Sequence, residues 1–286
     1  MQNGFPAQSD DAQIGVSVAS AADQASVLAG LEDIVLTSSS PSEPNPGTGS
    51  SATRGLQPTP NAPREHVNCN ISARAFAMSG AHARLSIKAP CHSNERLEIH
   101  HSGLTITQQT DEMGALNVTI PALSEYAIFL ISFDDQAGTV ATTHIPDIVR
   151  YDRFALQWQG DIGLQLHALE FGAAYGDAGH VWAGDQQQGA GSVVHLGHPG
   201  FEAAQNVEVY SFPAHSAEQS GTIALTVEAE VTDANCGRDL NVHSLELRAD
   251  RRLRSRALTL TMPMCTQVGE FLVLNNLFQD LTIAAK

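Results

Sequence analysis

Residues 89–133 read APCHSNERLEIHHSGLTITQQTDEMGALNVTIPALSEYAIFLISF and decide the fold class of this chain. Apolar and polar residues alternate in three short runs, which are Leu97/Ile99, Leu104/Ile106 and Leu116/Val118/Ile120. Alternation with a period of two is the pattern of a β-strand that places one face on a core. Turn residues separate the runs at Ser102-Gly103 and at residues 110–114, where we expect hairpins. The stretch therefore predicts successive antiparallel strands.

Two details of this stretch carry further expectations. Residues 128–133 are almost continuously apolar, which predicts a strand that is buried on both faces. His100 and His101 stand just before the Ser-Gly turn. Adjacent strand residues point to opposite faces, so the two imidazoles cannot share one metal ion without a bulge. We expect both histidines to face solvent at the edge of a hairpin.

The second half of the chain repeats the strand pattern. The longest run, residues 222–231, places five apolar residues on one face, which is typical of a half-exposed antiparallel sheet. Residues 271–283 fit either a strand pair turning at Asn275-Asn276 or a short helix, and we favour the strands. We predict an all-β protein of antiparallel β-sandwich modules, one at residues 66–150 and one at 151–286. A single larger sandwich would give the same pattern.

Residues 1–65 differ from the rest, because they are rich in Ser, Pro, Ala and Gly and hold few large apolar residues. Such a segment buries too little apolar surface to offset its chain entropy, so we expect a disordered tether. The sequence shows no basic and apolar leader and no run of about 18 apolar residues. That absence favours the cytoplasm, whereas the abrupt start of the tether suggests that an N-terminal membrane anchor is missing.

The charge balance narrows the classes of partner. The chain has 286 residues and a formal net charge of −16, with only 16% charged residues. Binding to nucleic acid or to an anionic membrane needs a positive field, so we expect neither as a partner. Four cysteines, Cys69, Cys91, Cys236 and Cys265, could form two disulfides in an oxidising compartment or remain free thiols in the cytosol. Sequence alone permits three pairings. The spacing matches no zinc ribbon or finger, and we predict no metal and no cofactor.

Several strings resemble known families. The strand and turn order of residues 96–121 resembles transthyretin-like and carboxypeptidase-regulatory β-sandwiches. A second resemblance, to an uncharacterised family of exported alphaproteobacterial β-proteins sometimes labelled translocases, covers about residues 67–286. It rests on APCHSNER (89–96), PALSE (121–125), QLHALEFGA (165–173), GHVWA (179–183), ANCGR (234–238) and FLVLNNL (271–277). This resemblance implies an N-terminal anchor and a tether, but no reaction and no catalytic residues.

The Gly-rich segment at residues 165–183 concentrates His, acidic and aromatic side chains. If they converged, His167, Glu170 and His180 could hold a metal ion, and the aromatic residues could form a platform on which a sugar or a peptide stacks. However, His167 and Glu170 are three apart, which on a strand points them to opposite faces. A Gly-rich loop whose aromatic residues fill the core is the plainer alternative. The candidate binding residues of this group are Trp158, His167, Glu170, Tyr175, His180 and Trp182.

A second candidate is the one local concentration of positive charge, on a predicted hairpin tip before a strand at residues 257–262. It could dock an anionic partner, or it could simply be a solvated hairpin whose charges protect a sheet edge. The cluster consists of Arg248, Arg251, Arg252, Arg254 and Arg256.

Catalytic signatures such as Gly-x-Ser-x-Gly, His-Glu-x-x-His and phosphate-binding glycine loops are missing from the sequence. We therefore predict a noncatalytic binding or structural module of the periplasm or cell envelope, held on a tether. Its partner would be an envelope protein or a glycan. The alternative is a hydrolase that acts on envelope polymers through residues 165–183.

Overall fold

A computed structural model describes residues 69–185, 189–275 and 277–285, all of which belong to one compact unit. The predicted tether at residues 1–65 lies outside them. The described residues form antiparallel strands arranged in four sheets, which confirms the all-β prediction. In these same ranges, no helix combines the length and apolar character needed to cross a membrane.

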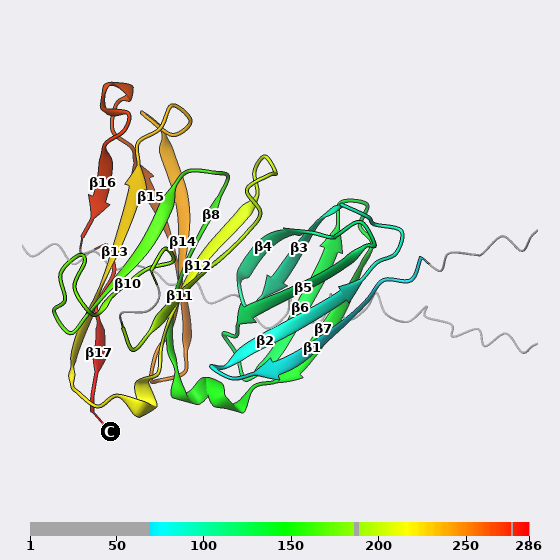
Figure 1. The fold of residues 1–286 in the computed structure, drawn as a ribbon, viewed down its shortest axis with the longest axis horizontal. Helices are drawn as coiled ribbons and strands as arrows, with labels where there is room; N and C mark the ends of the chain where they lie inside the picture. The colour runs from blue at the N-terminus through cyan, green and yellow to red at the C-terminus, as the bar shows by residue number, and fades with distance from the viewer. Residues whose placement is uncertain (1–68, 186–188, 276, 286) are drawn as a thin grey trace, which may run out of the picture. The chain divides into compact units, whose positions relative to one another are not determined.

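Two sheets are built from the first half of the chain (Figure 1). Sheet A has the strand order β1-β2-β5 and sheet B has the order β4-β3-β6-β7. The alternating apolar residues predicted from the sequence do line a core, where Leu97, Ile99 and Ile106 are fully buried. The strands are β1 (Ser72–Met78), β2 (His82–Lys88), β3 (Arg96–His101), β4 (Leu104–Gln109), β5 (Ala115–Pro121), β6 (Tyr126–Phe133) and β7 (Gly138–His144).

The predicted hairpin at residues 110–114 is wrong, because β4 and β5 belong to different sheets. The turn is instead a crossover from sheet B to sheet A. Asp111 stabilises it by accepting hydrogen bonds at Oδ1 from the backbone N–H groups of Met113 and Ala115, at 2.9 and 2.8 Å. Gly114 has a φ of 69°, and a Cβ there would lie 2.0 Å from the carbonyl oxygen of Ala89. The sequence correctly indicated a turn, but it did not indicate that the two strands on either side belong to different sheets.

Strand β6 corrects a second expectation. Its apolar run is buried on one face only, since Ile128 is 54% exposed and Leu130 is 50% exposed. Phe129 and Ile131, between and beyond them, are buried in the core. Sheet B therefore presents an apolar outer face, and continuous hydrophobicity did not mean burial on both sides.

The second half of the chain forms sheet C, with the order β11-β12-β8-β14-β15, and sheet D, with the order β10-β9-β13-β16. Short 3₁₀ turns occur at Pro146–Arg150, Ala214–Ser216 and Cys265–Gln267. The strands of sheet C are β8 (Asp152–Gln159), β11 (Ser192–Leu196), β12 (Gln205–Phe212), β14 (Asp239–Leu247) and β15 (Leu253–Thr261). Those of sheet D are β9 (Leu164–Glu170), β10 (His180–Val181), β13 (Gly221–Glu230), β16 (Phe271–Leu274) and β17 (Leu281–Ile283).

Strand β13 organises sheet D. Its predicted apolar face is buried, and its other face carries Thr226 and Glu228. The C-terminal strands β16 and β17 both pair antiparallel with β13, at residues 227–230 and 221–223. Residues 271–283 therefore form two strands as expected, but these run in the same direction along one edge and do not form a hairpin with each other.

Sheet C contributes to both hydrophobic cores of the described residues. Phe154 and Leu156 pack in the core that sheet C shares with sheet D, while Ala155, between them, packs in the core of sheets A and B. Strand pairing in the described residues does not cross Pro146–Arg150. Because one core nevertheless draws on both halves, the division at residue 150 stays a prediction.

Hydrogen bonds reinforce the contact between the halves. The fully buried Arg153 of β8 donates to the carbonyl oxygens of Gly80, at 2.6 Å, and of Ala122. Burial lowers the pKa of the Arg153 guanidinium to about 9. The backbone N–H of Thr105 donates to Gln157 Oε1 at 2.7 Å. These bonds fix the register between the loops of the first half and sheet C.

Two disulfides close local loops. Cys69 pairs with Cys91, and Cys236 pairs with Cys265, so each cysteine bonds its nearest neighbour in sequence. The first bond encloses both β1 and β2, and the second encloses the β14–β15 hairpin. Two disulfides point to an oxidising, exported environment, since cytosolic reductants keep most thiols reduced.

Candidate functional site

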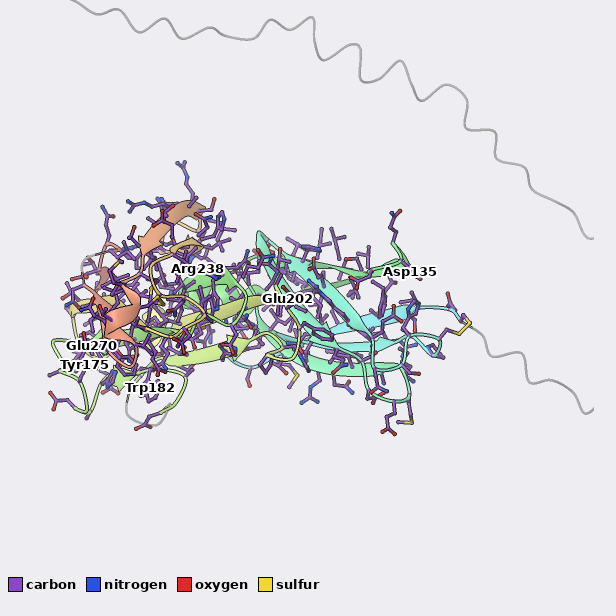
Figure 2. All side chains as sticks on the ribbon, turned by 90° about the horizontal axis from the view of Figure 1, so that it is seen from above. Asp135, Tyr175, Trp182, Glu202, Arg238 and Glu270 are labelled. Atoms are coloured by element: carbon purple, nitrogen blue, oxygen red, sulfur yellow. A yellow bond between two sulfur atoms is a disulfide. The ribbon has the colours of Figure 1, made fainter. Side chains whose placement is uncertain are left out.

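A pocket of about 630 Å³ lies on the outer face of sheet D and gathers four of the predicted site residues. Figure 2 labels Tyr175 and Trp182, two of the residues that line it. The four predicted residues are His167, Tyr175, His180 and Trp182. The remaining lining residues are Gln165, Gly176, Asp185, Glu228 and Phe271.

Strand register brings these residues together. Gln165 pairs with Glu228 and His167 pairs with Thr226, so His167 and Glu228 are diagonal neighbours on one face of the β9–β13 pair. On the other side of β9, β10 places His180 beside His167. On the far side of β13, β16 supplies Phe271, which is 55% exposed. Strands β9, β10, β13 and β16 of sheet D thus each supply part of the wall.

The two histidines form a hydrogen-bonded pair that lies next to a carboxylate. The backbone N–H of Gly176 donates to His180 Nδ1 at 3.0 Å, so this nitrogen presents a lone pair. In its neutral form His180 then carries its proton on Nε2, which lies 2.8 Å from Nδ1 of His167. His167 in turn carries its proton on Nε2, which is buried and lies 3.4 Å from Glu228 Oε2. The hydrogen-bond pattern therefore assigns one tautomer to each ring.

Aromatic rings surround this pair. Trp182 stacks on His167 with a centroid distance of 5.3 Å and an interplanar angle of 20°. Tyr175 contacts both imidazoles, with centroids 5.3 Å from His167 and 4.7 Å from His180. Gly184 leaves space for the indole, because a Cβ there would lie 2.3 Å from the Trp182 ring. The rings hold the histidines in place and leave Tyr175, 44% exposed, at the mouth of the pocket.

Burial and Glu228 set the electrostatics of the site. Burial lowers the pKa of His167, against the opposing effect of the Glu228 charge. Burial, together with a hydrogen bond to Glu228 and the charge of that carboxylate, raises the pKa of Tyr175 to about 12. The Tyr175 hydroxyl is therefore a hydrogen-bond donor to Glu228 at neutral pH, and His167 is favoured in its neutral form.

Glu170 does not belong to this pocket. As the odd offset on the strand predicted, it points to the opposite face from His167, where it is 4% exposed. Its carboxylate accepts hydrogen bonds from the hydroxyl of Tyr210 at 2.7 Å and from the backbone N–H groups of Ala190 and Gly191 at 2.7 and 2.8 Å. Glu170 thus anchors residues 190–191 to the core, and burial next to it raises the pKa of Tyr210.

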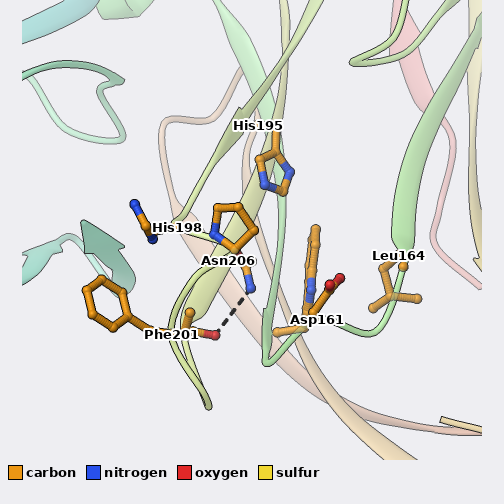
Figure 3. A pocket seen from close by; sticks show the side chains of 10 residues that line it. Asp161, Leu164, His195, His198, Phe201 and Asn206 are labelled. Carbon is orange, nitrogen blue, oxygen red and sulfur yellow. Dashed lines mark hydrogen bonds between the residues drawn. The ribbon is translucent and has the colours of Figure 1, made fainter. Parts of the chain in front are cut away.

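Trp158, the sixth predicted binding residue of this group, lies elsewhere. It is 4% exposed and lines a smaller pocket of about 110 Å³ together with His195, His198 and Asn206 (Figure 3). In this pocket Asn206 donates to the carbonyl oxygen of Ala204 at 3.2 Å. Trp158 is mainly a core residue, and it adds nothing to the pocket of His167.

The arginine cluster is not confined to a hairpin tip. Strand β15 begins at Leu253 rather than at the predicted residue 257, so Arg254 and Arg256 lie on the strand itself. Arg254 forms an ion pair with Asp250. Among the residues that the structure describes, the side chains of Arg252 and Arg256 form no ion pair.

The other two arginines of the cluster hold structural elements together. Arg248 pairs with Glu246 at 2.8 Å and donates to the carbonyl oxygens of Gln279 and Asp280. Arg251 donates to the carbonyl oxygen of Tyr151 at 2.6 Å and lies 3.7 Å from Asp152. Three carboxylates therefore neutralise three of the five guanidinium groups, which weakens the case for an anion-binding surface.

Sequence reasoning missed Glu228 and Phe271, although both lie in segments that were correctly predicted as strands. The alternation of residues 222–231 did place Glu228 on the exposed face of β13. What was missing was the neighbour of β13 and its register. No group of three or more His, Cys, Asp or Glu residues within the described ranges is arranged to hold a metal ion.

Comparison with known proteins gives no family for this chain. Its sequence matches no protein-family model, and it matches no curated protein either.

Proposed function

We propose that this chain is a noncatalytic binding module of the cell envelope, and that the sheet D pocket holds part of a glycan. The pocket combines exposed aromatic rings with a small number of fixed polar groups, which is the usual composition of a small-ligand site. Tyr175 and Phe271 offer ring surface for stacking, and Glu228 and Gln165 offer hydrogen-bond partners. The pocket is large enough for one or two sugar rings.

The engagement of the imidazole nitrogens is the observation that carries the noncatalytic part of the proposal. General base catalysis needs a lone pair within hydrogen-bond reach of the substrate. Both nitrogens of His180 and Nδ1 of His167 are already used in hydrogen bonds. The remaining nitrogen, Nε2 of His167, is buried and faces Glu228. No imidazole in this pocket presents a free lone pair to a ligand.

The alternative hydrolase at residues 165–183 is less well supported. It needs an acid beside the histidines, and Glu170 points into the core on the other face of sheet D. Glu228 and Asp185 are carboxylates that do line the pocket, but the imidazoles beside them offer no free lone pair, and Glu228 accepts from Tyr175.

Placement in the periplasm is part of the same proposal. It is supported by the two disulfides, which fit an oxidising compartment. The Ser- and Pro-rich composition of residues 1–65 supports a tether between this module and an envelope structure.

Isothermal titration with purified envelope oligosaccharides tests the proposal. Tyr175→Ala and Phe271→Ala should each weaken binding about tenfold, since stacking on one ring is worth about 1 kcal/mol or more. Tyr126→Ala is the matched control, because Tyr126 is a 72% exposed ring on sheet B. Unchanged binding in both pocket variants, or release of shortened products from the oligosaccharides, would contradict a noncatalytic glycan site.

A further inference from the structure

The distribution of charge along the sequence singles out the surroundings of the pocket. Between Arg153 and Arg238 the chain contains no Lys or Arg. The described part of the chain after Arg256 contains none either. All five strands of sheet D fall within these two segments, so the sheet carries no cationic side chain other than histidine. The segment between Arg153 and Arg238 holds ten acidic residues: Asp161, Glu170, Asp177, Asp185, Glu202, Glu208, Glu218, Glu228, Glu230 and Asp233.

Two of these acids line the pocket itself, namely Asp185 and Glu228. A third, Glu230, is exposed on β13 and pairs with Phe271 in the register of β13 with β16. The residues that line the pocket include no Lys or Arg, and an acidic concave surface of this kind concentrates positive charge and repels anions. The pocket therefore selects the sign of its ligand before any specific contact is made.

The individual groups that line the pocket also favour a positively charged ligand. Glu228 accepts from Tyr175 and faces His167, yet a carboxylate has about four acceptor positions, so part of its capacity remains for a ligand. The rings of Tyr175, Trp182 and Phe271 line the same space. Aromatic faces attract ammonium groups through their quadrupoles, and a nearby carboxylate adds a direct ion pair. A cation thus finds both kinds of partner in one pocket.

We propose that the ligand of this pocket carries a protonated amine, so that the glycan is a de-N-acetylated amino sugar. This inference rests on the proposed function, because it takes a sugar as the occupant and adds its charge. The amine would bind between Glu228 and the rings of Tyr175 and Phe271. An N-acetylated sugar presents a neutral amide in place of the ammonium group and would lose both the ion pair and the cation–π contact.

The test compares two sugars that differ only in this group. The full chain is titrated at about pH 6 with a glucosamine tetramer and with an N-acetylglucosamine tetramer, conditions under which amines are protonated. We expect the glucosamine tetramer to bind at least tenfold more tightly, and Glu228→Gln to reduce this preference to less than about threefold. Glu202→Gln, which removes an exposed acid outside the pocket, should leave the preference unchanged. Asp185→Asn provides a second pocket variant should Glu228→Gln fail to fold.

The possible failures are distinguishable. Equal affinity for the two tetramers would overturn the inference about charge and leave the glycan site standing. A preference that survives in both pocket variants would also overturn it. Absence of binding by either tetramer or by any envelope oligosaccharide would overturn the proposed function as well. Tighter binding of oligolysine than of either sugar would assign the pocket to a basic peptide and overturn the sugar assignment.

Discussion

Protonation of His101 should destabilise the fold in mildly acidic solution. The sequence predicted a solvent-facing histidine at this position, but His101 is only 1% exposed. Its Nδ1–H donates to the carbonyl oxygen of Ile128 at 3.0 Å, and its Nε2 accepts from the backbone N–H of Leu123 at 2.9 Å. The ring also stacks on Phe129. Only the neutral imidazole can make both hydrogen bonds, because a second proton on Nε2 would remove its lone pair.

The magnitude follows from the pKa of this side chain. Burial, with a smaller contribution from the charge of Arg153, lowers the pKa of His101 from 6.5 to about 4. An unfolded chain therefore takes up the proton at a higher pH than the folded protein does. Stability is fully present above about pH 6.5 and is lost as the pH falls towards 4. The difference between the two values corresponds to about 3 kcal/mol.

The assay is urea unfolding at about pH 7.5 and about pH 4.5, with His101→Gln beside the unmodified chain. The unmodified chain should lose about 2 to 3 kcal/mol more than the variant between these two values. His100→Gln is the control, because His100 is the half-exposed neighbour of His101. The loss of stability between the two pH values should differ from that of the unmodified chain by less than about 0.5 kcal/mol. Equal pH dependence in His101→Gln and the unmodified chain, or an NMR titration midpoint of His101 near 6.5, would refute the reasoning.

The other predictions concern stability and can be checked by the same unfolding measurement. Glu170→Ala should cost about 3 to 5 kcal/mol, because it leaves two buried donors and one partly buried donor without an acceptor, and a loss below about 1 kcal/mol would contradict this. Replacing both Cys236 and Cys265 by Ser should cost about 3 to 4 kcal/mol, from the entropy of a loop of 29 residues in the unfolded chain; unchanged stability after reduction would argue against it. Arg251→Met should cost about 1 to 3 kcal/mol because Arg251 bonds Tyr151 and pairs with Asp152, whereas Arg252→Met should stay within about 0.5 kcal/mol; equal effects of the two would show that the cluster acts through its charge alone.

Periodicity predicted the strands well because it reports one thing, the side of a strand that meets a core. It succeeded for residues 222–231, where the five apolar residues predicted to share one face are all buried. It failed where the pattern does not report which element covers the other face of the strand. The continuous apolar run of β6 predicted burial on both faces, yet Ile128 and Leu130 lie on an open face of sheet B. An apolar side chain is more stable when it is buried, but whether another layer covers its face of the sheet depends on the rest of the chain.

Strand pairing was the part that local sequence could not determine. Turn chemistry at residues 110–114 is the same for a hairpin and for a crossover, because Asp111 and Gly114 satisfy the local backbone in both cases. The same limit applies to β16 and β17, which could have paired with each other but both lie along β13. Which strand lies beside which is decided by the packing of both faces of each sheet, over separations of tens of residues.

In the candidate site, too, local sequence identified some residues, whereas strand pairing determined which of them come together. Residues 165–183 stood out in the sequence because their chemistry is local, and four of the six predicted residues do meet in one pocket. Strand parity separates Glu170 from it, since Glu170 lies at an odd offset from His167 on β9, and Trp158 lies on β8 of sheet C. Glu228, which follows His167 by 61 residues in the sequence, joins through the register of β13 with β9. Its carboxylate accepts a hydrogen bond from Tyr175 and lies 3.4 Å from His167 Nε2, so an acid that is central to the pocket is one that no local motif could identify.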